Sequence, residues 1–143
     1  MVYLSTLDDK GRISLPTRLR GTLTENKLIL TKGNSLGIWV FLPEAWEQFS
    51  QDVAASAASF EESTLIQHQF IIPMVEQEID KAGRIAIPPS LRDFAGLSRD
   101  CKILEARKHL EIWDSECYEG YLKANTEKLQ GIMAKMGPLG IFS

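Results

Sequence analysis

A thirteen-residue phrase occurs twice in this chain, and this repeat limits the possible folds more than any other feature. The first copy, DDKGRISLPTRLR, spans residues 8–20, and the second, DKAGRIAIPPSLR, spans residues 80–92, a constant shift of 72 positions. Aligned without gaps, seven pairs are identical: Asp8/Asp80, Gly11/Gly83, Arg12/Arg84, Ile13/Ile85, Pro16/Pro88, Leu19/Leu91 and Arg20/Arg92. The same shift aligns VFLPEAWE, residues 40–47, with IWDSECYE, residues 112–119. Two copies are too few for an open solenoid, so we interpret the chain as an internal duplication.

Each copy predicts the same order of short elements. VYLSTL and FIIPMVEQEI are apolar and β-prone, which indicates a strand before each phrase. The turns DDKG and DKAG follow, in which the aspartate caps the turn and the glycine accepts a positive φ. RISL and RIAI then alternate polar and apolar residues, as half-buried strands do, so Arg12 and Arg84 are expected to face solvent. The proline after each strand suits the first turn of a short helix.

A second hairpin and an amphipathic helix are predicted after the short helix of each copy. KLILTK with GIWVFL, and CKILEA with LEIW, have the composition of paired strands. Helices are expected to begin at Pro43 in the first copy and near Asp114 in the second. Halves of about 45 residues are too small to bury a core alone, so we expect them to pack on each other about a pseudo-twofold axis.

Charge is distributed unevenly along the chain. The net charge is −3, which as a single number argues mildly against nucleic-acid binding. Each repeated phrase nevertheless carries a net charge of +2, so the remainder of the chain carries −7. The basic residues of the phrases are Lys10, Arg12, Arg18 and Arg20 in the first copy and Lys81, Arg84 and Arg92 in the second. The two phrases are therefore basic segments of an acidic chain, and for nucleic-acid binding this distribution matters more than the net charge.

Several other classes of function find no support in the sequence. Cys101 and Cys117 match no metal-ligand spacing, so we expect neither a metal nor another cofactor. His68 and His109 have no acid and thiol at a spacing that suggests a catalytic triad, and no phosphate-binding loop is present. We therefore expect no enzyme and no small-molecule substrate. No run of eighteen apolar residues and no signal peptide are found, so no membrane partner is expected.

With both phrases in view, the chain resembles a known family. LDDKGRISLPTRLR and IDKAGRIAIPPSLR are similar to the motif of AbrB-type DNA-binding domains, and two such domains in one chain resemble the MraZ family. Its Asp-x-x-x-Arg signature occurs twice, as Asp8 to Arg12 and as Asp80 to Arg84. The resemblance implies an α+β fold: a duplicated SpoVT-AbrB swapped-hairpin β-barrel with pseudo-twofold symmetry, each half followed by amphipathic helices. The implied domains are residues 2–47, with a helix and connector to about 69, and residues 74–120, with a C-terminal helix to about 136.

The resemblance also implies a function. MraZ proteins are bacterial transcriptional regulators that bind double-stranded DNA at repeated promoter boxes, and they assemble into ring-shaped homo-oligomers. The expectation is a sequence-specific repressor of the division and cell-wall gene cluster, including its own gene, in the cytoplasm and associated with the nucleoid. An antitoxin-like protein-interaction module on the same fold, without direct DNA reading, is the alternative.

Roles for individual residues follow from the motif and from its predicted geometry. Arg12 and Arg84 are the candidates for base contact, because each follows a rigid turn. The residues expected to shape the turns and orient these arginines are Asp8, Asp80, Gly11 and Gly83. The further DNA-binding candidates are Lys10, Lys81, Arg18, Arg20 and Arg92. For Arg20 and Arg92, an internal salt bridge and a DNA contact remain equally open.

Overall fold

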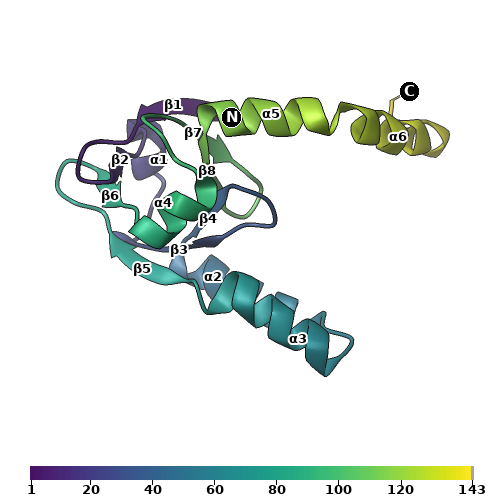
Figure 1. Cartoon of the computed structure of the whole chain (residues 1–143), viewed down its shortest axis with the longest axis horizontal. Helices are drawn as coiled ribbons and strands as arrows, with labels where there is room; N and C mark the ends of the chain where they lie inside the picture. Colours follow the sequence, from purple (N-terminus) through teal and green to yellow (C-terminus); the bar gives the residue numbers. More distant parts are fainter. Residues whose placement is uncertain (143) are drawn as a thin grey trace.

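Eight short strands and six α-helices make up the computed structural model, which describes residues 1–142 (Figure 1). The strands are β1 Val2–Thr6, β2 Arg12–Ser14, β3 Lys27–Lys32, β4 Ile38–Phe41, β5 Val75–Glu78, β6 Arg84–Ala86, β7 Asp100–Glu105 and β8 Leu110–Asp114. The helices are α1 Thr17–Arg20, α2 Pro43–Ala55, α3 Phe60–Ile66, α4 Pro89–Ala95, α5 Ser115–Ala124 and α6 Thr126–Met136. A π-helical turn, η1 Gln67–Ile71, and a 3-10 turn, η2 Gly137–Leu139, complete the described part. The predicted α+β class, with helices after each half, is confirmed.

Strands of the two halves pair mainly with each other. The main sheet has six antiparallel strands in the order β1-β7-β8-β4-β3-β5, and β2 pairs with β6 in a separate two-stranded ribbon. Only the pairs β3–β4 and β7–β8 join strands of one half, whereas β1–β7, β3–β5, β4–β8 and β2–β6 join the halves. Neither half therefore completes its sheet without the other.

The strand registers have the symmetry expected of a duplicated chain. In the β2–β6 ribbon, Ile13 lies opposite Ile85, its equivalent at a shift of 72 positions. In the main sheet, Ile38 pairs with Ile112 and Val40 pairs with Leu110, and the same shift exchanges these two pairs. Both registers therefore obey one pseudo-twofold symmetry. Its axis passes through the centres of the β2–β6 and β4–β8 ladders.

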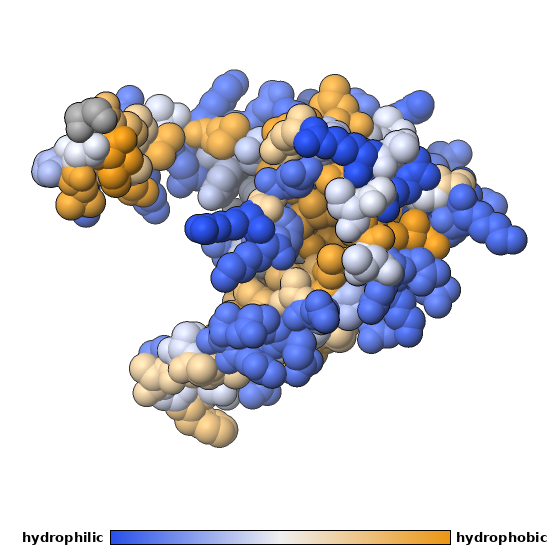
Figure 2. Space-filling model, turned by 180° about the vertical axis from the view of Figure 1, so that it is seen from behind, coloured by the Kyte–Doolittle hydropathy of each residue, from blue (hydrophilic) through white to orange (hydrophobic). Residues whose placement is uncertain are grey.

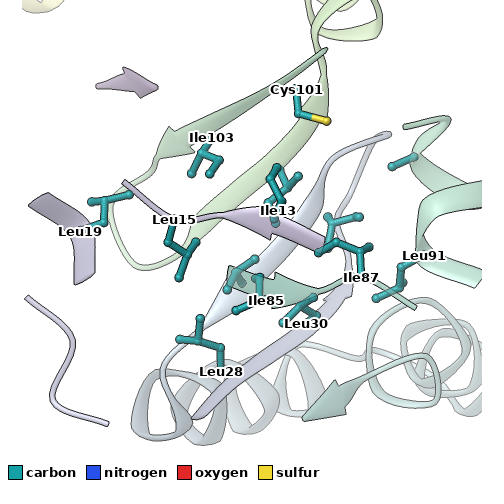
Figure 3. Packing of buried hydrophobic residues seen from close by; sticks show 14 residues of the cluster. Ile13, Leu15, Leu19, Leu28, Leu30, Ile85, Ile87, Leu91, Cys101 and Ile103 are labelled. Carbon is teal, nitrogen blue, oxygen red and sulfur yellow. The ribbon is translucent and has the colours of Figure 1, made fainter. Parts of the chain in front are cut away.

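The core lies between the ribbon and the main sheet. Ile13 and Ile85 are fully buried, and Leu30 and Ile103 of the central strands are fully buried as well. Figure 3 shows these side chains pointing toward one another from β2, β6, β3 and β7. Burying a large aliphatic side chain contributes roughly 1.5–3 kcal/mol, so this shared cluster holds the halves together.

The predicted β-barrel is not closed. β1 and β5 are the two edges of the main sheet, and β2 and β6 pair with each other instead of with those edges. A single bridge, Leu7 with Ile13, joins the segment after β1 to the ribbon. β2 and β6 pair across a separation of about 70 residues, and a tight turn after each edge strand ends its ladder before a ring of hydrogen bonds closes.

The predicted strand over FIIPMVEQEI begins later than expected. The chain is helical through Ile71, and β5 starts only at Val75. The carbonyl oxygen of Phe70 accepts a hydrogen bond from the buried Thr31 hydroxyl at 2.6 Å, and the Phe70 ring stacks on Trp39 at 6.0 Å between centroids. Tertiary contacts of this aromatic residue therefore override the β propensity of its neighbours.

Two helical arms extend from the strand-rich body (Figure 1). One consists of α2 and α3, and the other consists of α5 and α6, which carry the chain to its C-terminal end. The α3 helix begins after Ser59, whose hydroxyl accepts from the backbone N–H of Glu62 at 3.1 Å, a typical N-cap. Within residues 1–142, no helix combines the length and the hydropathy that crossing a membrane requires.

Candidate nucleic-acid interface

The turn between β1 and β2, residues 8–12, is organised by one carboxylate. Oδ1 of Asp8 accepts hydrogen bonds from the backbone N–H groups of Lys10 and Arg12, both at 2.9 Å. The carbonyl of Asp8 accepts from the N–H of Gly11 at 3.0 Å, and Gly11 has a φ of +76°. Aspartate side chains favour such turns, and only glycine adopts that φ without strain. We call this segment the first turn.

The turn between β5 and β6, residues 80–84, repeats this geometry and is called the second turn. Oδ1 of Asp80 accepts from the N–H groups of Ala82 and Arg84, both at 2.9 Å, and Gly83 has a φ of +78°. The residue at the third position differs between the turns, lysine in one and alanine in the other. The geometry is unaffected because that residue contributes only its backbone N–H.

The same carboxylates hold the arginine side chains. Nε of Arg12 donates to Oδ2 of Asp8 at 2.9 Å, and Nε of Arg84 donates to Oδ2 of Asp80 at 3.0 Å. The arginine side chains remain 29% and 33% exposed, so the outer nitrogens of each fork are available to a ligand. An arginine held through Nε loses less freedom when it binds than a mobile one.

Both arginines lie on one face of the β2–β6 ribbon. Arg12 lies opposite Ala86, and Arg84 lies opposite Ser14, while Ile13 and Ile85 point from the other face into the core. Nη1 of Arg84 also lies 3.9 Å from Oδ2 of Asp8. The guanidinium groups are therefore neither buried in the interior nor placed on opposite sides of the molecule.

Hydrogen bonds lower the pKa values of both turn aspartates. For Asp8 the largest cause is the backbone N–H of Arg12, followed among the stabilising contacts by the Arg12 guanidinium and the N–H of Lys10; desolvation opposes them. The pKa of Asp80 is lowered in the same way by Arg84 and Ala82. Both carboxylates are therefore ionised at neutral pH, and each turn presents an oriented Asp–Arg pair rather than a bare positive charge.

The arginines that close the repeated phrases cross to the opposite half. The Arg20 guanidinium, at the end of α1, lies against Gly83 of the second turn, and its Nη1 is 3.4 Å from the carbonyl oxygen of Ala82. The Arg92 guanidinium in α4 lies in the same way against Gly11 of the first turn. No carboxylate of residues 1–142 lies within ion-pairing distance of either, so the internal salt bridge left open above is absent from this part of the chain.

The remaining candidates are not equivalent. Lys10 and Lys81 are exposed residues of the two turns, at adjacent positions of the repeat. Arg18 is exposed on α1, and its Nη1 lies 2.9 Å from the sulfur of Met1, beside the start of β1. Arg18 therefore contacts the N-terminal residue rather than either turn. Within residues 1–142, no cluster of His, Cys, Asp and Glu could hold a metal ion.

One relationship was beyond sequence reasoning: the exchange of Arg20 and Arg92 between halves. The repeat places each arginine nine positions after the glycine of its own turn, which favours no contact with the other copy. Each copy does contain both a turn glycine and a closing arginine, which is the one sequence signal for such a contact. Only the strand register decides which glycine each arginine meets.

The chain belongs to the class of duplicated α+β proteins in which the two halves interlock and each contributes one oriented Asp–Arg turn to a shared face. A family model described as "MraZ protein, putative antitoxin-like" matches residues 3–68 and 70–136, and this chain belongs to that family. A protein of Treponema denticola named "Transcriptional regulator MraZ" is 39% identical over 139 residues, covering 96% of each chain. A protein of the same name from Treponema pallidum (strain Nichols) is 41% identical, covering 91% of this chain and 93% of its own. Another from Acetivibrio thermocellus is 32% identical, covering 97% of this chain and 96% of its own.

Proposed function

We propose that this chain is a DNA-binding transcriptional regulator that contacts double-stranded DNA through the exposed face of the β2–β6 ribbon. The observation that carries the proposal is the pair of arginines, Arg12 and Arg84, held through Nε on one face with their outer nitrogens exposed. The names of the related proteins support the same function.

The proposed mechanism divides the basic residues into two groups. An arginine fork that reaches the major groove recognises O6 and N7 of guanine, worth about 1–3 kcal/mol of discrimination per good contact. Arg12 and Arg84 have that role, because an aspartate fixes each of them. Lys10 and Lys81, exposed in the turns, neutralise phosphates and give affinity with little sequence information.

Assembly is part of the proposal, because one chain presents only two such turns. A ring-shaped homo-oligomer on repeated promoter boxes would gain affinity through multivalency, with effective concentrations of about a millimolar for short connections. The exposed apolar residues of the α5–α6 arm support self-association, and Figure 2 shows hydrophobic side chains gathered there, at the upper left. The exposed large hydrophobic residues of α5 and α6 are Tyr121, Leu122, Leu129, Ile132 and Met133.

The finer expectations from the family are kept within this proposal. They are repression of the division and cell-wall gene cluster including its own gene, a location in the cytoplasm and nucleoid, and a swapped-hairpin arrangement of the two halves. Strand pairing between the halves supports the last of these. The domain boundaries at residues 2–47 and 74–120 remain predictions.

Fluorescence anisotropy with a duplex of the protein's own upstream DNA tests the proposal. The double variant Arg12→Ala/Arg84→Ala should lose at least about a hundredfold in affinity at fixed salt, since two base contacts disappear. The matched control is Arg107→Ala, which removes an exposed cation from the pocket lined by Trp39, Phe41 and Phe49, away from the turns. Equal binding by the double variant and the wild type at the same salt concentration would rule the mechanism out.

A protein-interaction module is the second candidate, favoured by the words "antitoxin-like" in the family description and by the apolar α5–α6 arm. The same titration separates the two functions when it is run across a salt series. A steep loss of binding with salt supports the regulator. Absence of binding even at low salt, together with a tightly co-purifying partner protein, supports the interaction module.

A further inference from the structure

We propose that Arg20 and Arg92 are positioning residues that act across the pseudo-twofold axis, each holding the turn of the opposite half. Arg20 of the first half holds the second turn, and Arg92 of the second half holds the first. This inference rests on the proposed function for its consequence in DNA binding, while the contacts that carry it involve no DNA.

The first observation is the close approach of each guanidinium to a glycine. A side-chain carbon built on Gly11 would lie 2.5 Å from Nη1 and 2.7 Å from Cζ of Arg92. A side-chain carbon on Gly83 would collide in the same way with Nη1 and Cζ of Arg20. Each guanidinium therefore occupies the space that the side chain of any residue replacing the glycine would need. Glycine serves both the positive φ and this packing.

The second observation is a pair of backbone hydrogen bonds that join each turn to the opposite half, as the arginines do. The carbonyl of Gly83 accepts a hydrogen bond from the N–H of Leu15 at 2.9 Å, and the carbonyl of Gly11 accepts from the N–H of Ile87 at 2.8 Å. The second turn is thus held on one side by the end of β2 and on the other by Arg20, both from the first half. The first turn is held equivalently by the second half.

The third observation is the state of the arginine nitrogens. Nε of Arg20 and Nε of Arg92 are both buried without a hydrogen-bond partner, so neither is available to a phosphate. Nη2 of Arg20 donates to the Thr17 hydroxyl at 2.9 Å, and Nη1 lies 3.4 Å from the Ala82 carbonyl. The planar group is committed to packing and to the turn backbone, which is a geometry that the ammonium of lysine does not reproduce.

The consequence is a coupling between the halves. Arg20 lies 62 residues from Ala82 in sequence, yet it supports the turn that orients Arg84. A direct phosphate contact would make Arg20 independent of both signature arginines. A positioning role instead couples Arg20 to Arg84 and leaves it independent of Arg12, and it couples Arg92 to Arg12.

Amide hydrogen exchange on the free full-length protein gives a test without DNA. Arg20→Lys keeps the charge, and we expect exchange about tenfold faster at Ala82, Gly83 and Arg84, with the first turn unchanged. Arg92→Lys should affect Lys10, Gly11 and Arg12 instead. Arg18→Lys, on the same helix as Arg20 but beside Met1, is the matched control and should change neither turn. Faster exchange in the variant's own half, or in neither turn, would overturn the proposal.

Double-mutant cycles for DNA binding give the second test. We expect Arg20→Lys alone to weaken binding by about tenfold, and less than that in an Arg84→Ala background, because residues that act through one shared turn are non-additive. In an Arg12→Ala background the full effect should persist. Full additivity with both signature arginines would assign Arg20 a direct contact and overturn the positioning role. If the wild type binds no DNA, the proposed function fails, whereas the exchange experiment still decides this inference.

Discussion

Nη1 of Arg84 lies 3.9 Å from Oδ2 of Asp8, so the second turn reaches the carboxylate of the first. Asp8 therefore faces two arginines, its own partner Arg12 at 2.9 Å and Arg84 across the ribbon. Asp80 is paired only with Arg84 within 4 Å in the described part of the chain. The pseudo-twofold symmetry of the fold is consequently broken at the site itself.

This asymmetry predicts different effects of the two aspartates on sequence recognition. Asp8→Asn keeps the shape of the side chain but weakens the hold on both arginines, so the ratio of affinities for the box duplex and a scrambled duplex should fall about tenfold. Asp80→Asn should reduce that ratio less. Asp9→Asn, at an exposed neighbouring position, is the control and should leave it unchanged. Equal losses for the first two variants would contradict the asymmetry.

The turn aspartates also predict how stability depends on pH. The pKa values of Asp8 and Asp80 are lowered from 3.8 in the folded protein by hydrogen bonds from the turn backbone and the arginines. Their stabilisation is therefore fully present above that value and is lost as the pH falls through the lowered folded-state pKa. Urea unfolding of the wild type should show a falling midpoint across this acidic window. The Asp8→Asn/Asp80→Asn variant should lose less stability there, and an identical loss in both proteins would refute the assignment.

Gly83→Ala tests the requirement for glycine in the second turn. The new methyl group meets both a φ of +78° and the Arg20 guanidinium, so we expect a loss of about 1–3 kcal/mol in the free energy of unfolding. Combining it with Arg20→Ala should recover part of the steric component but not the backbone strain. Gly120→Ala in α5, where the added carbon meets nothing within 4 Å beyond the adjacent backbone of its own helix, should instead be neutral or stabilising by about 1 kcal/mol. Chemical denaturation measures all three.

The interlocked core predicts that a single truncation on the axis destabilises both halves together. Ile85→Ala removes a fully buried side chain that lies opposite Ile13, and a loss of about 2–5 kcal/mol is expected. Leu4→Ala, at a position 80% exposed on β1, should change stability by less than about 0.5 kcal/mol. Tryptophan fluorescence should report one cooperative transition, since Trp39 and Trp113 belong to different halves. Two separate transitions would show that the halves fold independently.

Much of the local structure could be predicted from residues close together in the chain. The alternation of Arg12, Ile13 and Ser14 correctly places Ile13 in the core, because neighbouring residues of a strand point to opposite faces. Helix starts at Pro43 and after Asp114 were also predictable, since proline and an aspartate N-cap are local signals. In contrast, the sequence predicts a strand over the early part of FIIPMVEQEI, and this part is helical. The reason is a distant contact: the Phe70 ring packs against Trp39 of β4, which lies before α2 and α3 in the chain.

By itself, the sequence determined the duplication and the family, because both follow from comparing residue identities along the chain. It also determined the Asp–Gly–Arg turns, because each turn depends on residues within a few positions of one another. Only the tertiary structure decided that the sheet stays open, that Arg20 meets Gly83 rather than Gly11, and that Asp8 lies near both signature arginines. Those outcomes depend on the register in which distant strands pair. The local alternation of polar and apolar residues decides which face of the β2–β6 ribbon enters the core, but it does not decide which residue of the other half each residue lies opposite.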